Sequence, residues 1–257
     1  MSVLLEVDQV SRRFGGLNAL RNVTFSVAQG EIVGLIGPNG AGKTTCFNVV
    51  SGVLPPSAGT IRFKGRDISG KKPSAIVSQG LVRTFQATTV FPAATVLENV
   101  MRGAFARTPV SLIGSVLNTP SARAVLGASQ DKCDRLLDRL GLTRFRRQAA
   151  GELPYGYQRR LGVAIALAAQ PQLLMLDEPV AGLNPEESAD MGHLIKEIRD
   201  AENVTVLLVE HHMRLVMGIC DRIVVLDHGE KIAEGLPAEI RADRKVIEAY
   251  LGTEDVT

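Results

Sequence analysis

The chain has 257 residues, of which 45% are hydrophobic and 22% are charged. A chain of this length holds one or two domains and buries a sizeable core, which excludes an intrinsically disordered protein and a large multidomain machine. Its 29 basic and 27 acidic residues leave a formal net charge of +2. That charge is too small to bind nucleic acid by itself, so any site for an anion must be local.

The cysteines and the N-terminus bear on where the protein works. Cys46, Cys133 and Cys220 lie far apart and form no C-x-x-C pair. This spacing argues against a disulfide framework and against a zinc site, and it fits a reducing compartment. Acids stand where a signal peptide needs its apolar core, and no run of about 20 apolar residues is present. We therefore expect a chain that is neither secreted nor membrane-spanning.

Continuous apolar runs in the sequence are typical of strands that are covered on both faces. Such runs lie at residues 32–36, 173–176, 204–209 and 222–226. Between the runs 173–176 and 204–209, apolar positions at helical spacing predict a helix over residues 185–199. Strands that alternate with helices predict an α/β fold with a parallel sheet.

Other segments show different patterns. Val23, Phe25 and Val27 alternate with polar neighbours, which predicts a half-buried strand. Similar short strands with Gly-rich turns in residues 1–35 and 58–70 predict an antiparallel β layer beside the parallel core.

Helical patterns replace the strands in the middle of the sequence. We therefore predict a helical subdomain over residues 87–158, inserted into an α/β core formed by residues 1–86 and 159–257. The Ser/Ala/Gly-rich stretch 108–129 is the segment that we expect to be most mobile.

A phosphate-binding pattern follows the apolar run that ends at Ile36. Residues 37–45 match G-x-x-x-x-G-K-[ST] and lead into a helical pattern, the context that this motif requires. Its glycines let backbone N–H groups surround a phosphate, and the helix N-terminus adds positive charge. Lys43 would neutralise the β and γ oxygens, and the Thr44 hydroxyl would hold Mg²⁺. The predicted nucleotide-binding residues are Gly37, Pro38, Asn39, Gly40, Ala41, Gly42, Lys43, Thr44 and Thr45.

Two acids follow the apolar run 173–176. Asp177 would hold Mg²⁺ directly or through water, and Glu178 would act as general base toward the attacking water. Without the phosphate-binding pattern, we would interpret the pair as acids that cap a strand end.

The order of these motifs resembles the ATP-binding subunits of ABC transporters over nearly the whole chain. The resemblance rests on residues 37–45, Gln86, an Arg-rich turn near Gly156, Asp177 and Glu178, residues 181–184, and His211. It implies a P-loop ABC ATPase fold whose nucleotide-binding core has a parallel sheet, an antiparallel β layer and a helical subdomain. It also implies that Phe14 stacks on adenine, that Gln86 contacts Mg²⁺ and the attacking water, and that His211 contacts the γ-phosphate.

The signature turn departs from the family pattern. Where the family has Leu-Ser-Gly-Gly-Gln, residues 153–157 read Leu-Pro-Tyr-Gly-Tyr. By resemblance, Pro154, Tyr155 and Gly156 would face the ATP bound to a partner, and the serine hydroxyl is lost. We expect a helix over residues 158–169 and a proline that is compatible with its first helical position.

A closer resemblance is to the ATPase of branched-chain amino acid importers, the LivG type. It rests on residues 14–20, 82–86, 119–123, 158–161, 181–185, 215–219 and 249–252. It implies ATP and Mg²⁺ as ligands, a position at the cytoplasmic face of the inner membrane, and uptake of branched-chain or other hydrophobic amino acids. The implied partners are a paralogous second ATPase or a second copy, two membrane permeases and, indirectly, a solute-binding protein.

Two alternatives stay open. The same ATPase could serve another cargo, such as urea, amides or a lipid, because cargo contacts lie in other subunits. A nucleic-acid or translation ATPase of the same fold generally needs a coiled coil, zinc-binding cysteines or two cassettes, and the sequence shows none of these. We therefore expect no nucleic-acid partner.

Overall fold

The computed structural model describes residues 2–84, 90–105 and 120–251. Within them, one sheet has the strand order β10-β9-β3-β8-β7-β6. Its strands are β3 (Ile32–Ile36), β6 (Leu81–Arg83), β7 (Leu173–Asp177), β8 (Thr205–Val209), β9 (Arg222–Asp227) and β10 (Glu230–Gly235). All neighbouring pairs are parallel except β10 with β9, so the predicted α/β class is confirmed.

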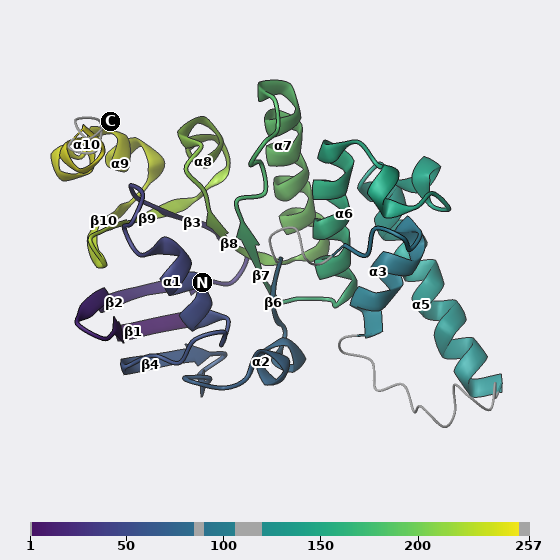
Figure 1. The fold of residues 1–257 in the computed structure, drawn as a ribbon, viewed down its shortest axis with the longest axis horizontal. Helices are drawn as coiled ribbons and strands as arrows, with labels where there is room; N and C mark the ends of the chain where they lie inside the picture. Colours follow the sequence, from purple (N-terminus) through teal and green to yellow (C-terminus); the bar gives the residue numbers. More distant parts are fainter. Residues whose placement is uncertain (1, 85–89, 106–119, 252–257) are drawn as a thin grey trace.

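Two apolar cores lie on opposite faces of this sheet, because successive side chains of a strand point to opposite sides. In β3, Ile32 and Ile36 belong to the core on the side of α7 (Pro185–Glu202) and α8 (Met213–Ile219). Val33 and Leu35 belong to the other core, with α1 (Lys43–Val50) and the second sheet (Figure 1). Burial on both faces explains why these strands read as continuous apolar runs.

The second sheet is antiparallel and has the strand order β2-β1-β4-β5. Its strands are β1 (Val3–Phe14), β2 (Leu17–Ala28), β4 (Ala58–Phe63) and β5 (Arg66–Asp67). In β2, Val23, Phe25 and Val27 are buried while their neighbours are less covered, as the alternating pattern predicted.

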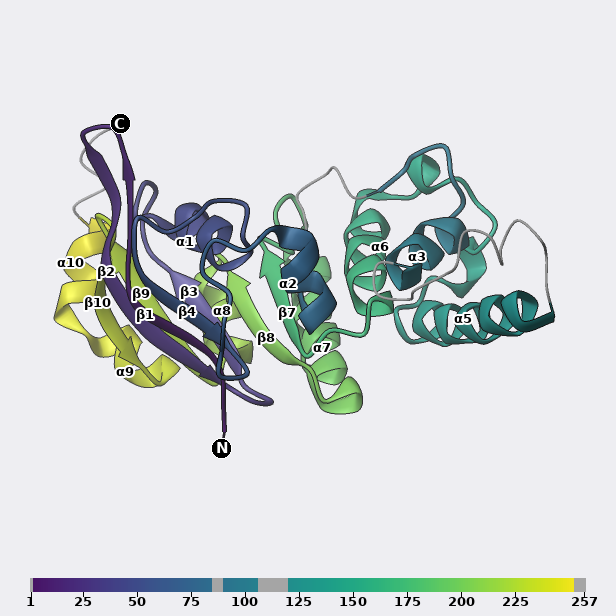
Figure 2. The same ribbon diagram turned by 90° about the horizontal axis from the view of Figure 1, so that it is seen from below.

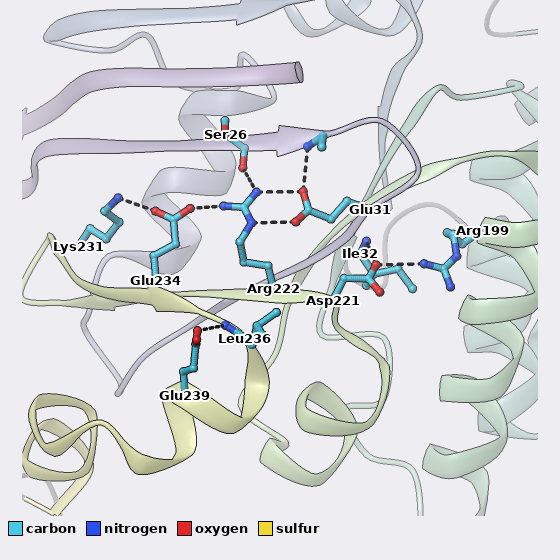
Figure 3. Close-up of polar contacts among 11 residues, drawn as sticks. Ser26, Glu31, Ile32, Arg199, Asp221, Arg222, Lys231, Glu234, Leu236 and Glu239 are labelled. Carbon is cyan, nitrogen blue, oxygen red and sulfur yellow. Dashed lines mark hydrogen bonds and ion pairs between the residues drawn. The ribbon is translucent and has the colours of Figure 1, made fainter. Parts of the chain in front are cut away.

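A partly buried arginine joins the two sheets. The Arg222 guanidinium in β9 donates to both Glu31 oxygens, at 2.7 and 2.9 Å, and to the Ser26 carbonyl of β2 at 2.6 Å (Figure 3). It also contacts Glu234 of β10. The hydrogen bonds and negative charges of Glu31, first, and of Glu234 raise the pKa of Arg222. The antiparallel layer is thereby held on the strand that flanks β3.

Most of the described residues between β6 and β7 are helical, and these helices form a separate lobe in Figure 2. They are α3 (Val96–Phe105), α5 (Pro120–Arg139), η1 (Thr143–Phe145), η2 (Ala150–Glu152) and α6 (Tyr155–Ala168). The remaining helices are α2 (Pro73–Gln79), α9 (Pro237–Ala242) and α10 (Arg244–Leu251). No helix in the described part of the chain is both long and apolar enough to cross a bilayer.

Three expectations need correction or qualification. The helix expected over 158–169 begins at Tyr155, because the Pro154 carbonyl already accepts from the N–H groups of Tyr157 and Gln158. Pro154 is therefore the N-cap and not the first helical residue. Part of the stretch expected to be mobile belongs to α5, and its residues 108–119 lie outside the described ranges. The antiparallel edge strand β10, rich in charged residues, was not predicted.

Candidate functional site

The phosphate-binding loop connects β3 to α1 and is held tightly by neighbouring backbone. Gly37 has φ +149°, and a Cβ there would lie 2.0 Å from the Leu226 carbonyl oxygen. Gly42 has φ +99°, and a Cβ there would lie 2.7 Å from the Ala19 carbonyl oxygen. Neither position accepts a larger residue without movement of the backbone, so the two glycines are required by packing as well as by conformation.

Lys43 lies inside this loop with its ammonium group turned onto the loop's own backbone. Its Nζ donates to the carbonyls of Gly37 at 2.6 Å and of Pro38 at 2.8 Å. Burial lowers the pKa of Lys43, while the charge of Glu178 acts in the opposite direction. A cation held by neutral carbonyls lacks a full counter-charge, which favours the approach of a phosphate.

Other residues of the loop present donors to solvent. Asn39, Gly40 and Thr44 are exposed, whereas Ala41 is buried and Thr45 is partly buried. The first N–H groups of α1 have no earlier helical carbonyl to bond, and the helix dipole makes this end positive. The loop therefore offers an anion site of the predicted kind.

Asp177 ends β7 and is paired with Arg83, which ends β6. The Arg83 guanidinium donates to Asp177 Oδ2 at 2.6 Å, and the two side chains are 8% and 3% exposed. The same guanidinium donates to Asn48 Oδ1 at 2.7 Å and to the Ser51 hydroxyl at 3.1 Å, both on the α1 side. Arg83 therefore brings the Asp177 carboxylate beside the helix that begins at the phosphate-binding loop.

Glu178 has a backbone conformation that is unusual for a residue with a side chain. Its φ is +46°, in the left-handed region, and its N–H donates to the Val209 carbonyl at 2.9 Å. Such strain is found preferentially at functional sites. The turn brings Glu178 Oε1 to 3.6 Å from Nδ1 of His211, which follows β8 by two residues. Both side chains are accessible to solvent.

The signature turn lies at the start of α6, where Pro154 and Tyr155 are exposed and Gly156 is partly buried. Tyr155 packs against Gly182, where a Cβ would lie 2.9 Å from its ring. Arg159 binds the Tyr155 hydroxyl and donates to the Ala181 carbonyl at 3.2 Å. The turn is thus tied to the loop that follows Glu178 and Pro179.

The predicted site residues are not all gathered in one place. Figures 1 and 2 both show β7 and β8 between α1 and α6, so the phosphate-binding loop and the signature turn lie apart. Phe14 is 42% exposed at the tip of the β1–β2 hairpin, with the Arg12 guanidinium 4.7 Å from its ring centre. Gln86 lies outside the described residues.

Sequence reasoning missed two charged residues of this region. Arg83 stands in the quoted motif but received no role, and Glu210, which directly follows β8, was not considered. Both stand at or just beyond the carboxyl end of a strand, the same signal that had drawn attention to Asp177. The contact of Arg83 with Asp177 and that of Glu210 with Val180, however, depend on which strands are neighbours in the sheet.

Comparisons with known proteins agree with the geometry. The profile of the ABC transporter family matches residues 20–181, and that of the branched-chain amino acid ATP-binding cassette transporter matches residues 230–256. The chain is 45% identical over 249 residues to the high-affinity branched-chain amino acid transport ATP-binding protein LivG of Salmonella typhimurium. This match covers 97% of the chain and 98% of the relative. Identity to the corresponding protein BraF of Pseudomonas aeruginosa is 43%, with the same coverage.

Solved structures show the same fold. An ATP-binding cassette of an ABC transporter in its ADP conformation superposes with a TM-score of 0.85 at 30% sequence identity. The match covers 98% of this chain and all of that cassette. The chain therefore belongs to the ABC transporter family, as one of its nucleotide-binding ATPase subunits.

Proposed function

We propose that this chain hydrolyses ATP to drive the import of branched-chain or other hydrophobic amino acids. The observation that carries the proposal is similarity along the whole chain to ATP-binding proteins named for branched-chain amino acid transport. The phosphate-binding loop with Lys43, and the approach of His211 to Glu178, supply a site that suits the reaction.

Mg²⁺ fits the donor set of this site. Within the described ranges, no three His, Cys, Asp or Glu side chains gather into a metal site, so the protein would supply few ligands. Thr44 and Asn48 lie one helical turn apart on α1, and Arg83 brings Asp177 to that side of the helix. Hydroxyl, carboxylate and phosphate oxygens suit Mg²⁺. Thr44 and Asp177 would hold the ion, which supplies charge neutralisation on the phosphate oxygens.

The residues of the chain divide the reaction between them. Residues 37–45 bind and orient the phosphates, and Lys43 leaves the carbonyls of Gly37 and Pro38 to contact the β and γ oxygens. Glu178 accepts a proton from the attacking water at a carboxylate oxygen. His211, on the same side, donates a hydrogen bond to the γ-phosphate as charge builds up. By resemblance, Phe14 provides a stacking surface for adenine, and Gln86 contacts Mg²⁺ and the attacking water.

A second ATPase subunit completes the site. The signature turn 154–156 is largely exposed and lies apart from the chain's own phosphate-binding loop, so it is free to cover the ATP of a paralogue or of a second copy. The permeases would dock at the cytoplasmic face of the membrane, on the surface around Gln86, Val90, Phe91 and Pro92. Phe91 and Pro92 are exposed and Val90 is partly buried, whereas Gln86 lies outside the described residues. The solute-binding protein would act through the permeases.

Two substitutions test the assignment of Lys43 and Glu178. Glu178→Gln should retain ATP affinity and lose most turnover, because a general base acts only in the chemical step. Lys43→Ala should lose affinity as well, because the lysine neutralises charge on bound ATP. Fluorescent-nucleotide titration and single-turnover hydrolysis measure both effects. Equal losses of ATP binding in the two variants would contradict the assignment.

The cargo is tested separately in cells that lack the gene. Complementation should restore uptake of labelled leucine and isoleucine, and Glu178→Gln should not complement. Restored uptake of labelled urea or a short amide, without leucine uptake, would favour the other cargo while leaving the ATPase assignment intact.

A further inference from the structure

Glu210 is a fully buried carboxylate between the two loops that carry Glu178 and His211. Its side chain is 0% exposed. One oxygen, Oε1, accepts a hydrogen bond from the Val180 N–H at 3.1 Å. The other, Oε2, accepts from the N–H groups of His211 at 3.1 Å and His212 at 3.2 Å.

These bonds use backbone donors on both sides. Val180 lies two residues after Glu178, in the segment that continues to the Ala181 carbonyl bound by Arg159. The N–H groups of His211 and His212 lie in the loop between β8 and α8, where no strand partner is available. A carboxylate is the only side chain that presents two acceptor oxygens and no donor, so a single group satisfies donors from both loops.

The bridge has a consequence for the site. The strained turn at Glu178 and the short loop at His211 are otherwise joined through the Glu178 N–H to the Val209 carbonyl and through the 3.6 Å approach of the two side chains. A buried charge-assisted hydrogen bond is short-ranged and directional, so it restricts how far either loop can move alone. Small displacements of positioned groups lower catalytic rates strongly.

We propose that Glu210 is a positioning residue that holds the Glu178 and His211 loops in the spacing required for hydrolysis. The inference rests on the proposed function of those two residues. Glu210 is fully buried, and it acts through the backbone N–H groups of Val180, His211 and His212.

Two substitutions of Glu210 test the bridge in the full-length chain. Glu210→Gln keeps the size of the side chain but replaces one acceptor oxygen with a donor. Glu210→Asp keeps the charge and can still bond the adjacent N–H groups, but it is one methylene too short to reach Val180. Both variants should keep ATP affinity within about twofold and lower the single-turnover rate at least about tenfold.

Thr205→Val is the matched control. Thr205 is also fully buried on β8, at the opposite end of the strand, and its hydroxyl accepts from the Gly30 N–H at 2.9 Å. This variant loses a buried hydrogen bond and some stability, but its hydrolysis rate should stay within about twofold of the original. A rate loss in Thr205→Val as large as in Glu210→Asp would overturn the proposal.

A double-mutant cycle and hydrogen exchange separate positioning from general destabilisation. In a His211→Ala background, Glu210→Asp should lower the rate by a smaller factor than it does in the unmodified chain, because one of the two groups whose spacing it sets is gone. Fully multiplicative losses would overturn the proposal.

Hydrogen exchange of the Val180 amide should accelerate in Glu210→Asp, and unchanged exchange there would show that no bridge exists. If Glu178→Gln retains turnover while the Val180 amide exchanges faster in Glu210→Asp, the proposed role of Glu178 has failed but the Glu210 bridge stands.

Discussion

The Arg83 guanidinium and the Asp177 carboxylate form an ion pair of 2.6 Å that is almost completely shielded from water. Arg83 also reaches Asn48 and Ser51 on the side of α1. One side chain therefore joins the edge strand β6, the acid at the end of β7 and the helix of the phosphate-binding loop. This arrangement makes Arg83 a structural support of the Mg²⁺ site proposed at Thr44 and Asp177.

Removing Arg83 should destabilise the nucleotide-free protein. Arg83→Met leaves the Asp177 carboxylate buried without a counter-charge, which costs about 3–5 kcal/mol of unfolding free energy. Excess Mg²⁺ and ATP should reduce this loss, because a cation then lies beside Asp177. Denaturant unfolding with and without Mg·ATP measures both values. Arg62→Met is the control, because the Arg62–Glu6 pair is exposed and is worth at most about 1 kcal/mol. Equal losses in the two variants would contradict the buried-pair argument.

Phe91→Asp should uncouple ATP hydrolysis from transport. The Phe91 backbone is held by the buried Asn99 side chain, which accepts from its N–H at 2.8 Å, while the ring is 53% exposed under Arg102. An aspartate there removes apolar area from the proposed permease surface without touching the phosphate-binding loop. ATP affinity should stay unchanged and uptake should fall. Val3→Asp, at another exposed apolar position, is the control, and unaffected transport in Phe91→Asp would exclude this surface.

Pro154 should make one of two ATP sites slow in an assembled pair. As the N-cap of α6, it supplies neither a serine hydroxyl nor an N–H to the partner's γ-phosphate. A lost hydrogen bond to a charged group costs about 1.5–3 kcal/mol, which corresponds to a roughly ten- to hundredfold slower step. Inactivating the general base of one subunit at a time separates the sites. Equal residual turnover in both cases, unchanged by Pro154→Ser, would show that the sites are equivalent.

The three cysteines should be inert in the folded protein at pH 8. Burial raises the pKa of the Cys46 and Cys220 thiols to about 12 and that of Cys133 to about 11, with nearby acids adding to the last two. A thiol reagent should therefore label the chain only on unfolding. Because the folded pKa lies above the unfolded value, the stability associated with these thiols is present below pH about 9 and is lost toward pH 12. Rapid labelling of native protein at pH 8 would contradict this expectation.

Local patterns in the sequence predicted the parts of the site that depend on consecutive residues. The loop 37–45 could be recognised because its glycines, lysine and threonine act within one turn between a strand and a helix. Asp177 and Glu178 stood out because they end an apolar strand. The start of α6 was predicted three residues too late, because the sequence pattern does not mark the first turn of the helix, which begins directly after the N-cap Pro154.

The sequence by itself determined the α/β class, the order of the motifs and the chemical identity of the phosphate-binding loop, because these follow from periodicity and adjacency along the chain. Only the tertiary structure decided that Arg83 pairs with Asp177 and that Glu210 joins the loops of Glu178 and His211. In each pair or bridge, residues far apart in sequence meet because their strands are neighbours in the sheet. Strand order is set by packing of the two cores, which no local pattern records.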